Sequence, residues 1–294
     1  MDYNFEVEQE EKGKRIDLFL VSKLGSGYSR TFIQQLILKK EVLLNNLPVS
    51  SHHKVNSGDF VSARIIEDKE TQIAPEDIAL KIVYEDDDIL VVDKPSGLVV
   101  HPGAGNLTGT LVNALLNHTK NLSCINPQRP GIVHRLDKET SGVMVVAKNN
   151  MSHLKLVKQF ASHSIKRKYV AVVSGAVEFD EGVIDLPIGR HKRDFRRQAV
   201  SFYKSKEAVT RYKVLKRLKN TTMLELIPET GRTHQLRVHL AHLGHPILGD
   251  TKYARTKDFT RLALHAAELG FMHPGNGKFV SFSSCVPEEF FIRE

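Results

Sequence analysis

The 294-residue sequence contains no tryptophan and only two cysteines, Cys124 and Cys285. Two cysteines cannot form a disulfide scaffold, and they are typical of free thiols in a reducing compartment. The N-terminal segment MDYNFEVEQEEKGKR is acidic and polar, so it lacks the apolar stretch of a signal peptide. No run approaches the roughly 18 apolar residues that a membrane helix needs. These absences predict a cytoplasmic protein without a membrane partner.

Positive charge exceeds negative charge, giving a formal net charge of +8. The segment up to Ala74 is close to neutral, so nearly all of the excess lies in the C-terminal part. Such a balance favours a polyanionic partner, although charge alone leaves open a basic protein without one. With 41% hydrophobic residues, the chain can form one large core or two domains.

The first part of the chain has the pattern of a small module with two helices and short strands. Apolar residues recur at helical spacing over 14–23, which predicts an amphipathic helix. Ser29 can cap a second helix over 30–40, and Lys39 and Lys40 would close it, because cations are favoured at a helix C-terminus. Short strands are expected at Val42–Leu44, Pro48–Val49 and Phe60–Ile66.

This order of elements, with the wording RIDLFL, SRTFIQQLILKKEVLLNNLPV and KVNSGDFV, resembles the S4 RNA-binding domain. The resemblance implies an S4-like α/β module over residues 13–75 that grips structured RNA. The side chains that match the family's RNA-binding surface are Arg30, Gln34, Lys39 and Lys40. A solvated helix face is the alternative explanation for each of them.

Residues 67–79 are polar and acidic, which predicts a linker. Beyond it, strand-like segments rich in Val and Ile mix with helical patterns. Strands are expected at Leu80–Tyr84, Ile89–Asp93, Val143–Lys148, Tyr169–Val173 and Met223–Ile227, and helices at 109–117, 151–161 and 233–243. Because regular βαβ spacing is missing, the order favours an α+β sheet over a doubly wound fold. We expect a second domain over residues 80–294.

Asp137 stands between an arginine and a turn of small residues, and an apolar strand follows at once. Loops beside rigid strands often carry catalytic groups. A carboxylate there can act as a nucleophile on a sugar carbon or as a base, provided that it stays ionised. A neighbouring guanidinium favours the ionised form, whereas burial alone opposes it. Without further information, an isolated Asp in a turn is more often a backbone cap.

The nine residues HRLDKETSG at 134–142 resemble the signature of the RluA-type pseudouridine synthases. The resemblance implies that Asp137 is catalytic. It also implies that Tyr169, in the segment KRKYVA, stacks on the target base and is a candidate to take up its C5 proton. The segment Asp93–Pro102 matches the family's Lys-Pro-x-Gly turn, which is largely structural. The Gly-x-Gly at 103–105 is more typical of a loop than of a dinucleotide site.

A third motif, ETGRTHQLRVHL, carries two arginines. Thr233 can cap a helix there, and Gly244 would end it. The apolar stripe of that helix is expected at Leu236, Leu240 and Leu243. Arg237 lies off this stripe and matches the family's basic residue that pairs with Asp137. Arg232 is the rival for that role, but spacing within the motif favours Arg237.

The segment GRHKRDFRR at 189–197 places five basic side chains beside an aromatic residue. Such density suits a loop that grips phosphate groups, with a solvated basic loop as the alternative. The RNA-binding candidates outside the S4-like module are Arg135, Arg190, Lys192, Arg193, Arg196, Arg197 and Arg232.

The two resemblances cover nearly the whole chain and imply an RNA pseudouridine synthase with a mixed, mainly antiparallel sheet and a central catalytic cleft. The reaction breaks the N1–C1′ bond of a uridine, turns the bound uracil and joins C5 to C1′, so no cofactor is needed. Asp137 would attack the sugar or remove its 2′ proton, and the sequence does not choose between these routes. Arg237 would keep Asp137 ionised. The wording RPGIVHRLDKETSG looks most like the branch that modifies large-subunit ribosomal RNA.

A non-enzymatic S4-type RNA-binding or ribosome-assembly factor is the alternative function. The complete set of Asp137, Tyr169 and Arg237 speaks against it, because a pure binder need not keep all three. A metallohydrolase built on the histidines of residues 234–245 fits worse, since no carboxylate or cysteine stands at ligand spacing and no HExxH pattern occurs. We expect a monomer without a metal.

Overall fold

The chain forms two compact units, Met1–Gln72 and Ile73–Glu294. This computed structural model describes residues 2–24, 30–65, 73–103, 105–254 and 259–291, without the side chains of Thr31 and Gln35. Ser29, the expected cap of the second helix, and residues 67–72 of the expected linker lie outside the described residues.

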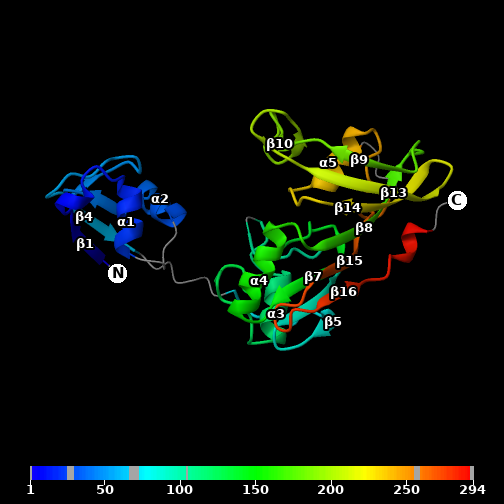
Figure 1. Ribbon diagram of the computed structural model, residues 1–294, viewed down its shortest axis with the longest axis horizontal. Helices are drawn as coiled ribbons and strands as arrows, with labels where there is room; N and C mark the ends of the chain where they lie inside the picture. Colours follow the sequence, from blue (N-terminus) through cyan, green and yellow to red (C-terminus); the bar gives the residue numbers. More distant parts are fainter. Residues whose placement is uncertain (1, 25–29, 66–72, 104, 255–258, 292–294) are drawn as a thin grey trace. The chain divides into compact units, whose positions relative to one another are not determined.

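The first unit is a four-stranded antiparallel sheet with two helices (Figure 1). Its strands are β1 (Asp2–Glu6), β2 (Val42–Leu44), β3 (Leu47–Pro48) and β4 (Phe60–Arg64), in the order β1-β4-β2-β3. Its helices are α1 (Ile16–Leu24) and α2 (Arg30–Leu38), preceded by the 3-10 turn η1 (Gln9–Glu11). The sequence pattern did not predict β1, because its two inward side chains, Tyr3 and Phe5, stand among polar residues.

The helices of the first unit form where apolar spacing predicts them. Phe19 and Leu20 of α1 are fully buried, as is Ile33 of α2. Helix α2 nevertheless ends at Leu38, two residues earlier than expected, and Lys40 has a left-handed φ of 61°. The predicted lysines therefore follow the helix and do not form its last turn.

The second unit is built on a nine-stranded mixed sheet (Figure 1). The strands run in the order β5-β6-β7-β15-β8-β14-β13-β9, and β16 pairs with β15 beside this path. Their bounds are β5 Lys81–Glu85, β6 Ile89–Lys94, β7 Ser141–Ala147, β8 Lys166–Ser174, β9 Glu181–Asp185, β13 Val209–Arg217, β14 Thr221–Pro228, β15 Leu264–Met272 and β16 Phe279–Ser283. Among the described strands of this sheet, only β7 and β15 pair in parallel. The α+β fold with a mainly antiparallel sheet is thus confirmed.

Three helices accompany this sheet: α3 (Leu111–His118), α4 (Asn150–Ala161) and α5 (Gln235–His242). Strands β6 and β7 are buried on both faces, because α3 and α4 cover opposite sides. Leu90 and Met144 belong to the cluster around α3, whereas their neighbours Val91 and Val145 pack with Leu156 of α4. Burial on both faces explains why these strands are continuous apolar runs. None of the helices that the structure describes is long and apolar enough to cross a membrane.

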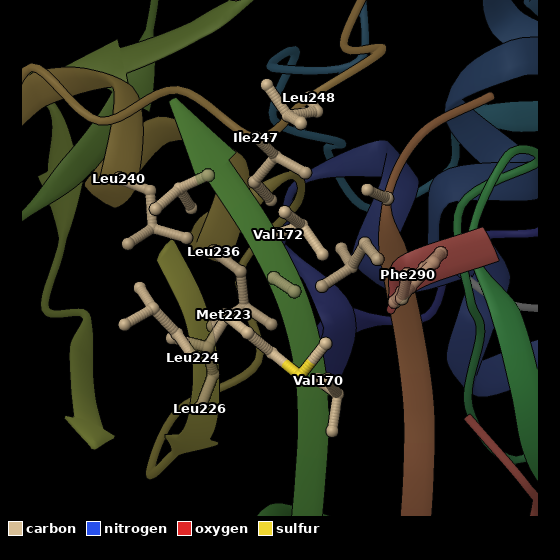
Figure 2. Close-up of a cluster of buried hydrophobic side chains, with 14 of the residues drawn as sticks. Val170, Val172, Met223, Leu224, Leu226, Leu236, Leu240, Ile247, Leu248 and Phe290 are labelled. Carbon is tan, nitrogen blue, oxygen red and sulfur yellow. The ribbon is translucent and has the colours of Figure 1, made fainter. Parts of the chain in front are cut away.

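Helix α5 packs on β8 and β14 in a separate apolar cluster (Figure 2). Leu236 and Leu240 belong to this cluster, together with Val172 of β8. Leu243, which was expected to extend the stripe, is 43% exposed, because the helix ends at His242. Gly244 terminates the helix as predicted, with a left-handed φ of 85°. A further 3-10 turn, η3 (Glu288–Phe290), places Phe290 in the same cluster.

A smaller sheet carries the basic segment. It consists of β10 (Ile188–Arg190), β11 (Gln198–Val200) and β12 (Ser205–Lys206), in the order β11-β10-β12. Residues 188–200 are named the basic hairpin here. Ile188 forms a buried cluster with Ala208 and with Val238 of α5. One helix therefore contacts both the core of the large sheet and the basic hairpin.

The described part of the expected linker, residues 73–79, is attached to the start of α3. The amide of Glu76 donates to the carbonyl of Asn113 (3.0 Å), and the Glu76 carboxylate accepts from the amide of Gly109. The side-chain amide of Asn113 donates to the carbonyl of Ala74 (2.8 Å). The linker prediction is wrong for these residues, because polar composition does not reveal such backbone contacts.

Candidate active site

Asp137 lies in a loop that is held from behind by the turn after β6. The carbonyl of Lys138 accepts from the Lys94 ammonium (3.0 Å) and from the amide of Gly97 (2.9 Å). The hydroxyl of Ser96 donates to the carbonyl of Glu139 (2.7 Å). The Lys-Pro-x-Gly turn thus fixes, through these hydrogen bonds, the backbone on the C-terminal side of Asp137.

Lys94 is 1% exposed, which is unusual for a lysine. Its ammonium also donates to the carbonyls of Pro95 and Leu98, both at 2.9 Å. Burial lowers the pKa of Lys94 to about 8, even though the nearby charges of Glu139 and Asp137 oppose this effect. The three carbonyls use all three donors of the ammonium.

Gly142 brings the loop against the centre of the sheet. It has a φ of 116°, and a Cβ atom at this position would collide with the backbone of Ala266 in β15. Only glycine fits both constraints. The glycine of the signature therefore permits the parallel pairing of β7 with β15 directly beside the Asp137 loop.

Arg237 pairs with Asp137, as the motif predicts. Its Nη1 donates to Oδ2 of Asp137 at 2.9 Å, although the two residues lie 100 positions apart. The guanidinium also makes a bidentate pair with Asp250, whose Oδ2 accepts from Nε and whose Oδ1 accepts from Nη2, both at 2.8 Å. Arg237 is 5% exposed and Asp250 is 1% exposed. One buried guanidinium therefore joins two carboxylates.

Asp250 orients Arg237, and the sequence motifs did not point to it. Burial raises the pKa of Asp250, but the hydrogen bonds and the charge of Arg237 outweigh this effect and hold the pKa below its usual range. The amides of Lys252 and Tyr253 also donate to its Oδ1, at 2.9 and 3.1 Å. For Arg237 the signs are opposite: burial lowers its pKa, but the two carboxylates more than reverse this effect and raise the pKa. Both partners of this pair are charged at neutral pH.

His234 and Tyr253 complete the surroundings of the pair. His234 has a left-handed φ of 55° and is the N-cap of α5, so the prediction of Thr233 as the cap is wrong. The Nδ1 of His234 bonds the Tyr253 hydroxyl (2.8 Å), and its Nε2 lies 3.9 Å from Oδ2 of Asp137. Burial lowers the pKa of His234, and the positive charge of Arg237 adds to the effect against the opposing carboxylates. The ring is therefore neutral at pH 7.

Tyr169 of β8 lines the same cleft as Asp137 and Arg237. Burial raises the pKa of Tyr169, the guanidinium of Arg167 opposes the rise, and the charge of Asp137 adds to it. The cleft has a volume of about 870 Å³ and is also lined by Arg135, Arg167 and Arg232. It is large enough for a nucleotide and part of its neighbour, and its walls are basic. The structure thus brings Asp137, Tyr169 and Arg237 together in one cavity.

The predicted RNA-binding residues of the first unit fall into two groups. Arg30 and Gln34 both donate to Oδ2 of Asp17, at 3.0 and 2.8 Å, and Arg15 forms a bidentate pair with the same carboxylate. Asp17 is fully buried, so it fixes the orientation of these side chains. Lys39 and Lys40 are exposed in the turn after α2.

In the second unit, the candidates on the hairpin are exposed, except for one. Arg190, Lys192, Arg193 and Arg196 are exposed. Arg197 is partly buried, and its guanidinium lies over the ring of Tyr253, 5.1 Å from the centroid. Arg135 is exposed at the cleft, and Arg232 is half-buried, with Nε donating to the carbonyl of Glu207 (2.8 Å).

Two of the histidines of residues 234–245 have structural partners. His239 is fully buried between the hydroxyl of Thr210 and the carbonyl of Leu186. His245 bonds the carbonyl of Ser174 at 2.9 Å. Within the described part of the chain, no three His, Cys, Asp or Glu residues gather in a way that could hold a metal ion.

Comparison with known proteins agrees with this site. Residues 88–242 match the family model described as RNA pseudouridylate synthase, and residues 14–61 match the S4 domain. The RNA pseudouridine synthase YlyB of Bacillus subtilis is 47% identical, over 96% of this chain and 94% of its own length. Ribosomal large subunit pseudouridine synthase D of Xanthomonas campestris is 42% identical, over 96% of this chain and 88% of its own.

A solved structure supports the same assignment. Human RNA pseudouridylate synthase domain containing 1 is 28% identical with a TM-score of 0.60, over 70% of this chain and 83% of its own. The chain therefore belongs to the RNA pseudouridylate synthase family, with an S4 domain before the catalytic unit. It is an isomerase that converts uridine in RNA to pseudouridine.

Proposed function

We propose that the enzyme modifies one or more uridines of large-subunit ribosomal RNA, acts as a monomer and works in the cytoplasm. The observation that carries the proposal is the pair of Asp137 and Arg237 in a basic cleft that also contains Tyr169. The choice of RNA rests on similarity, over nearly the full length, to enzymes named for the ribosomal large subunit. The S4 domain and the net charge of +8 support a structured RNA partner.

Asp137 is the group that acts on the ribose. Its Oδ2 accepts from Arg237 and lies near His234, whereas Oδ1 has no hydrogen-bond partner among the described residues. The free oxygen is the one available to C1′, in nucleophilic attack, or to the 2′ proton, in formation of a glycal. In either route Arg237 holds Oδ2 by its hydrogen bond and so fixes the orientation of the carboxylate.

The atoms of the reaction balance without a cofactor. In the nucleophilic route, the Oδ1–C1′ bond forms as the N1–C1′ bond breaks, and the uracil leaves with the electron pair. The uracil then turns, C5 bonds to C1′, and the carboxylate is released. The proton on C5 is lost and N1 gains one. The raised pKa of Tyr169 keeps its hydroxyl neutral at pH 7. A neutral ring suits a surface on which the turning uracil stacks better than it suits a general base that accepts the C5 proton.

The basic residues offset the cost of presenting the uridine. The target must leave its base stack to reach Asp137, at a cost of a few kcal/mol. We assign phosphate contacts to the exposed side chains of the basic hairpin and to Arg135 and Arg232 at the cleft. In the S4 domain we assign them to Arg30, Gln34, Lys39 and Lys40.

Pseudouridine mapping tests this function. Total RNA from cells that lack the protein is mapped, incubated with the purified enzyme, and mapped again. We expect a missing signal in large-subunit RNA to return with the parent enzyme but not with Asp137→Asn, which should bind the RNA within about threefold of the parent because it has nearly the same shape. Restored signals only in another RNA would overturn the choice of substrate, and an active Asp137→Asn would overturn the mechanism.

The same variant separates the enzyme from a non-enzymatic assembly factor. Nothing in the fold, the site or the comparisons favours the latter. If assembly were the function, Asp137→Asn would correct every growth or ribosome defect of the deleted strain. If the modification matters, the defect remains.

A further inference from the structure

Tyr253 stands between the basic hairpin and the catalytic pair. The guanidinium of Arg197 lies over the Tyr253 ring, 5.1 Å from its centroid, and the guanidinium of Arg237 lies 5.3 Å from the same centroid. Each such contact between a cation and an aromatic ring contributes about 0.5–2 kcal/mol. A single ring thus contacts one arginine that faces RNA and the arginine that holds Asp137.

The hydroxyl of Tyr253 makes a second set of links between the same two regions. It accepts from the amide of Gln198, at the start of β11, at 3.0 Å. The hydroxyl also bonds Nδ1 of His234 at 2.8 Å, and the ring of His234 packs edge-on against the ring of Tyr253. Ring and hydroxyl therefore each have one contact in the hairpin and one beside Asp137.

Arg197 differs from the other arginines of the hairpin in having a buried Nε without a hydrogen-bond partner. Within the described residues no carboxylate pairs with its guanidinium. The neighbouring Arg196, in contrast, is paired with Asp194. An RNA phosphate would give Arg197 the anion that it lacks while keeping its plane against the ring.

We infer that Tyr253 is a positioning residue that transmits RNA contact at the basic hairpin to the Asp137–Arg237 pair. Phosphate bound at Arg197 fixes Arg197 on the ring, and the ring and its hydroxyl fix Arg237 and His234. Hairpin contact then raises the rate of the chemical step as well as affinity, because a phosphate on Arg197 further restrains Tyr253 and, through it, Arg237 and His234. The inference rests on the proposed function, in that it concerns the same site.

A double-mutant cycle with single-turnover kinetics tests the coupling. We expect Arg197→Met, which keeps the side-chain bulk, and Tyr253→Leu each to lower the rate at saturating RNA about tenfold. The double variant should be no slower than the slower single variant, because both changes break one chain of contacts. Tyr253→Phe keeps the ring and should recover part of the loss. Lys206→Gln is the matched control: it removes an exposed charge from β12 of the same small sheet, outside the residues assigned to RNA, and should leave the saturated rate at the parent level.

Multiplying effects in the double variant, or a Tyr253→Leu enzyme that loses only affinity, would overturn the inference. If Tyr253→Leu does not fold, Arg197→Met decides alone: it must lower the rate at saturating RNA, and a loss of affinity with an unchanged saturated rate would overturn the inference. A second readout needs no RNA: NMR protection of the Arg237 Nε–H should fall in Arg197→Met and stay at the parent level in Lys206→Gln. Equal protection in both would contradict the coupling even if the substrate proposed above were wrong. An inactive parent enzyme on large-subunit RNA, with the NMR difference present, would instead count against the substrate alone.

Discussion

Arg237 is the residue that joins the two carboxylates of the proposed catalytic centre. Its five donors are divided so that Asp250 takes two of them in a bidentate pair and Asp137 takes one. Because Asp250 is 1% exposed and Asp137 lines the open cleft, one carboxylate serves as a fixed anchor and the other remains available for chemistry. Asp250 thus orients the guanidinium, and the guanidinium orients Asp137, the residue that we propose is catalytic.

Asp250→Asn should uncouple this arrangement. The amide places a donor against the guanidinium, so we expect a loss of about 3–5 kcal/mol in the free energy of unfolding, the range for breaking a buried ion pair. Chemical denaturation measures the loss. Asp180→Asn is the matched control, because Asp180 pairs with Arg217 while 83% exposed, and it should cost less than about 1 kcal/mol. Similar losses in the two variants would contradict the anchoring role.

His134 should make the stability of the enzyme depend on pH. Burial lowers the pKa of His134 to about 3, and the nearby charge of Arg167 adds to the effect. Its Nε2 accepts from the amide of Val145, and its ring stacks on Phe160. Since the unfolded state binds this proton near pH 6.5 and the folded state only near pH 3, stability is full above about pH 6.5 and falls as the pH drops toward 3.

Denaturation at a series of pH values checks this expectation. His134→Gln keeps an acceptor for the amide but cannot titrate. Between pH 6 and 4 we expect the parent to lose up to about 1.4 kcal/mol per pH unit more than this variant. His52→Gln, at an exposed position, should follow the parent. Parallel curves for the parent and His134→Gln would show that another group controls the acid limb.

The residues of the site differ in how far the sequence could reveal them. Asp137, Tyr169 and Arg237 stand in contiguous motifs, so resemblance to a family was enough to predict that they meet. Asp250 and Tyr253 stand in an irregular segment after Gly249, where neither helical nor strand periodicity applies. Their roles come from contacts with residues 13 and 19 positions away, Arg237 and His234, and no local pattern encodes these.

At the scale of elements, the parallel pair of β7 with β15 is the joint between two otherwise antiparallel halves of the sheet. Each half has its own apolar cluster, one around α3 and one around α5. The joint is short, with Ser141 opposite His265 and Gly142 opposite Ala266. The cleft lies beside this joint, so Asp137 and Arg237 come from different halves.

Gly142→Ala should therefore open the joint. The added Cβ would meet the Ala266 backbone, and the φ of 116° is unfavourable for alanine. We expect a loss of at least about 3 kcal/mol in the free energy of unfolding, measured by thermal and chemical denaturation. Gly277→Ala is the matched control, because Gly277 has a φ of 70° with no atom within 4 Å of the added Cβ. It should show only the backbone strain, about 1 kcal/mol. Equal losses would mean that close approach at the joint is unimportant.

Periodicity predicted elements well where a full face is buried and poorly where an element is short or ends irregularly. The apolar runs of β6 and β7 were correctly assigned, because both of their faces are covered. The N-terminus of α5 was misplaced by one residue, because the left-handed backbone of His234 replaces a side-chain cap at Thr233. Strand β1 depends on its pairing with β4, a partner about 60 residues away, which a local pattern does not contain.

At the scale of the whole molecule, each unit has its own buried core, so residues 73–294 should fold without the S4 domain. Removal of residues 1–72 should leave the saturated rate of residues 73–294 within about threefold of the parent. The affinity for RNA should fall, and the dependence of binding on salt should become shallower, because the phosphate contacts that we propose for Arg30, Lys39 and Lys40 would be lost.

Binding across a salt series, together with single-turnover rates, checks this prediction. The removed segment is nearly neutral overall, so a shallower salt dependence would reflect lost contacts and not a change of net charge. An unchanged salt dependence would mean that the S4 domain does not touch the RNA backbone. A large fall in the saturated rate would mean that the domain takes part in the chemical step.

The position of β15 also has a consequence for biosynthesis. This strand lies between β7 and β8, both of which leave the ribosome long before it does, since they end at Ala147 and Ser174 while β15 starts at Leu264. Until β15 is made, the two halves of the sheet have no strand to join them, and Asp137 has no fixed relation to Arg237. A nascent chain can thus contain a complete S4 domain, and hold RNA, well before it can isomerise a uridine.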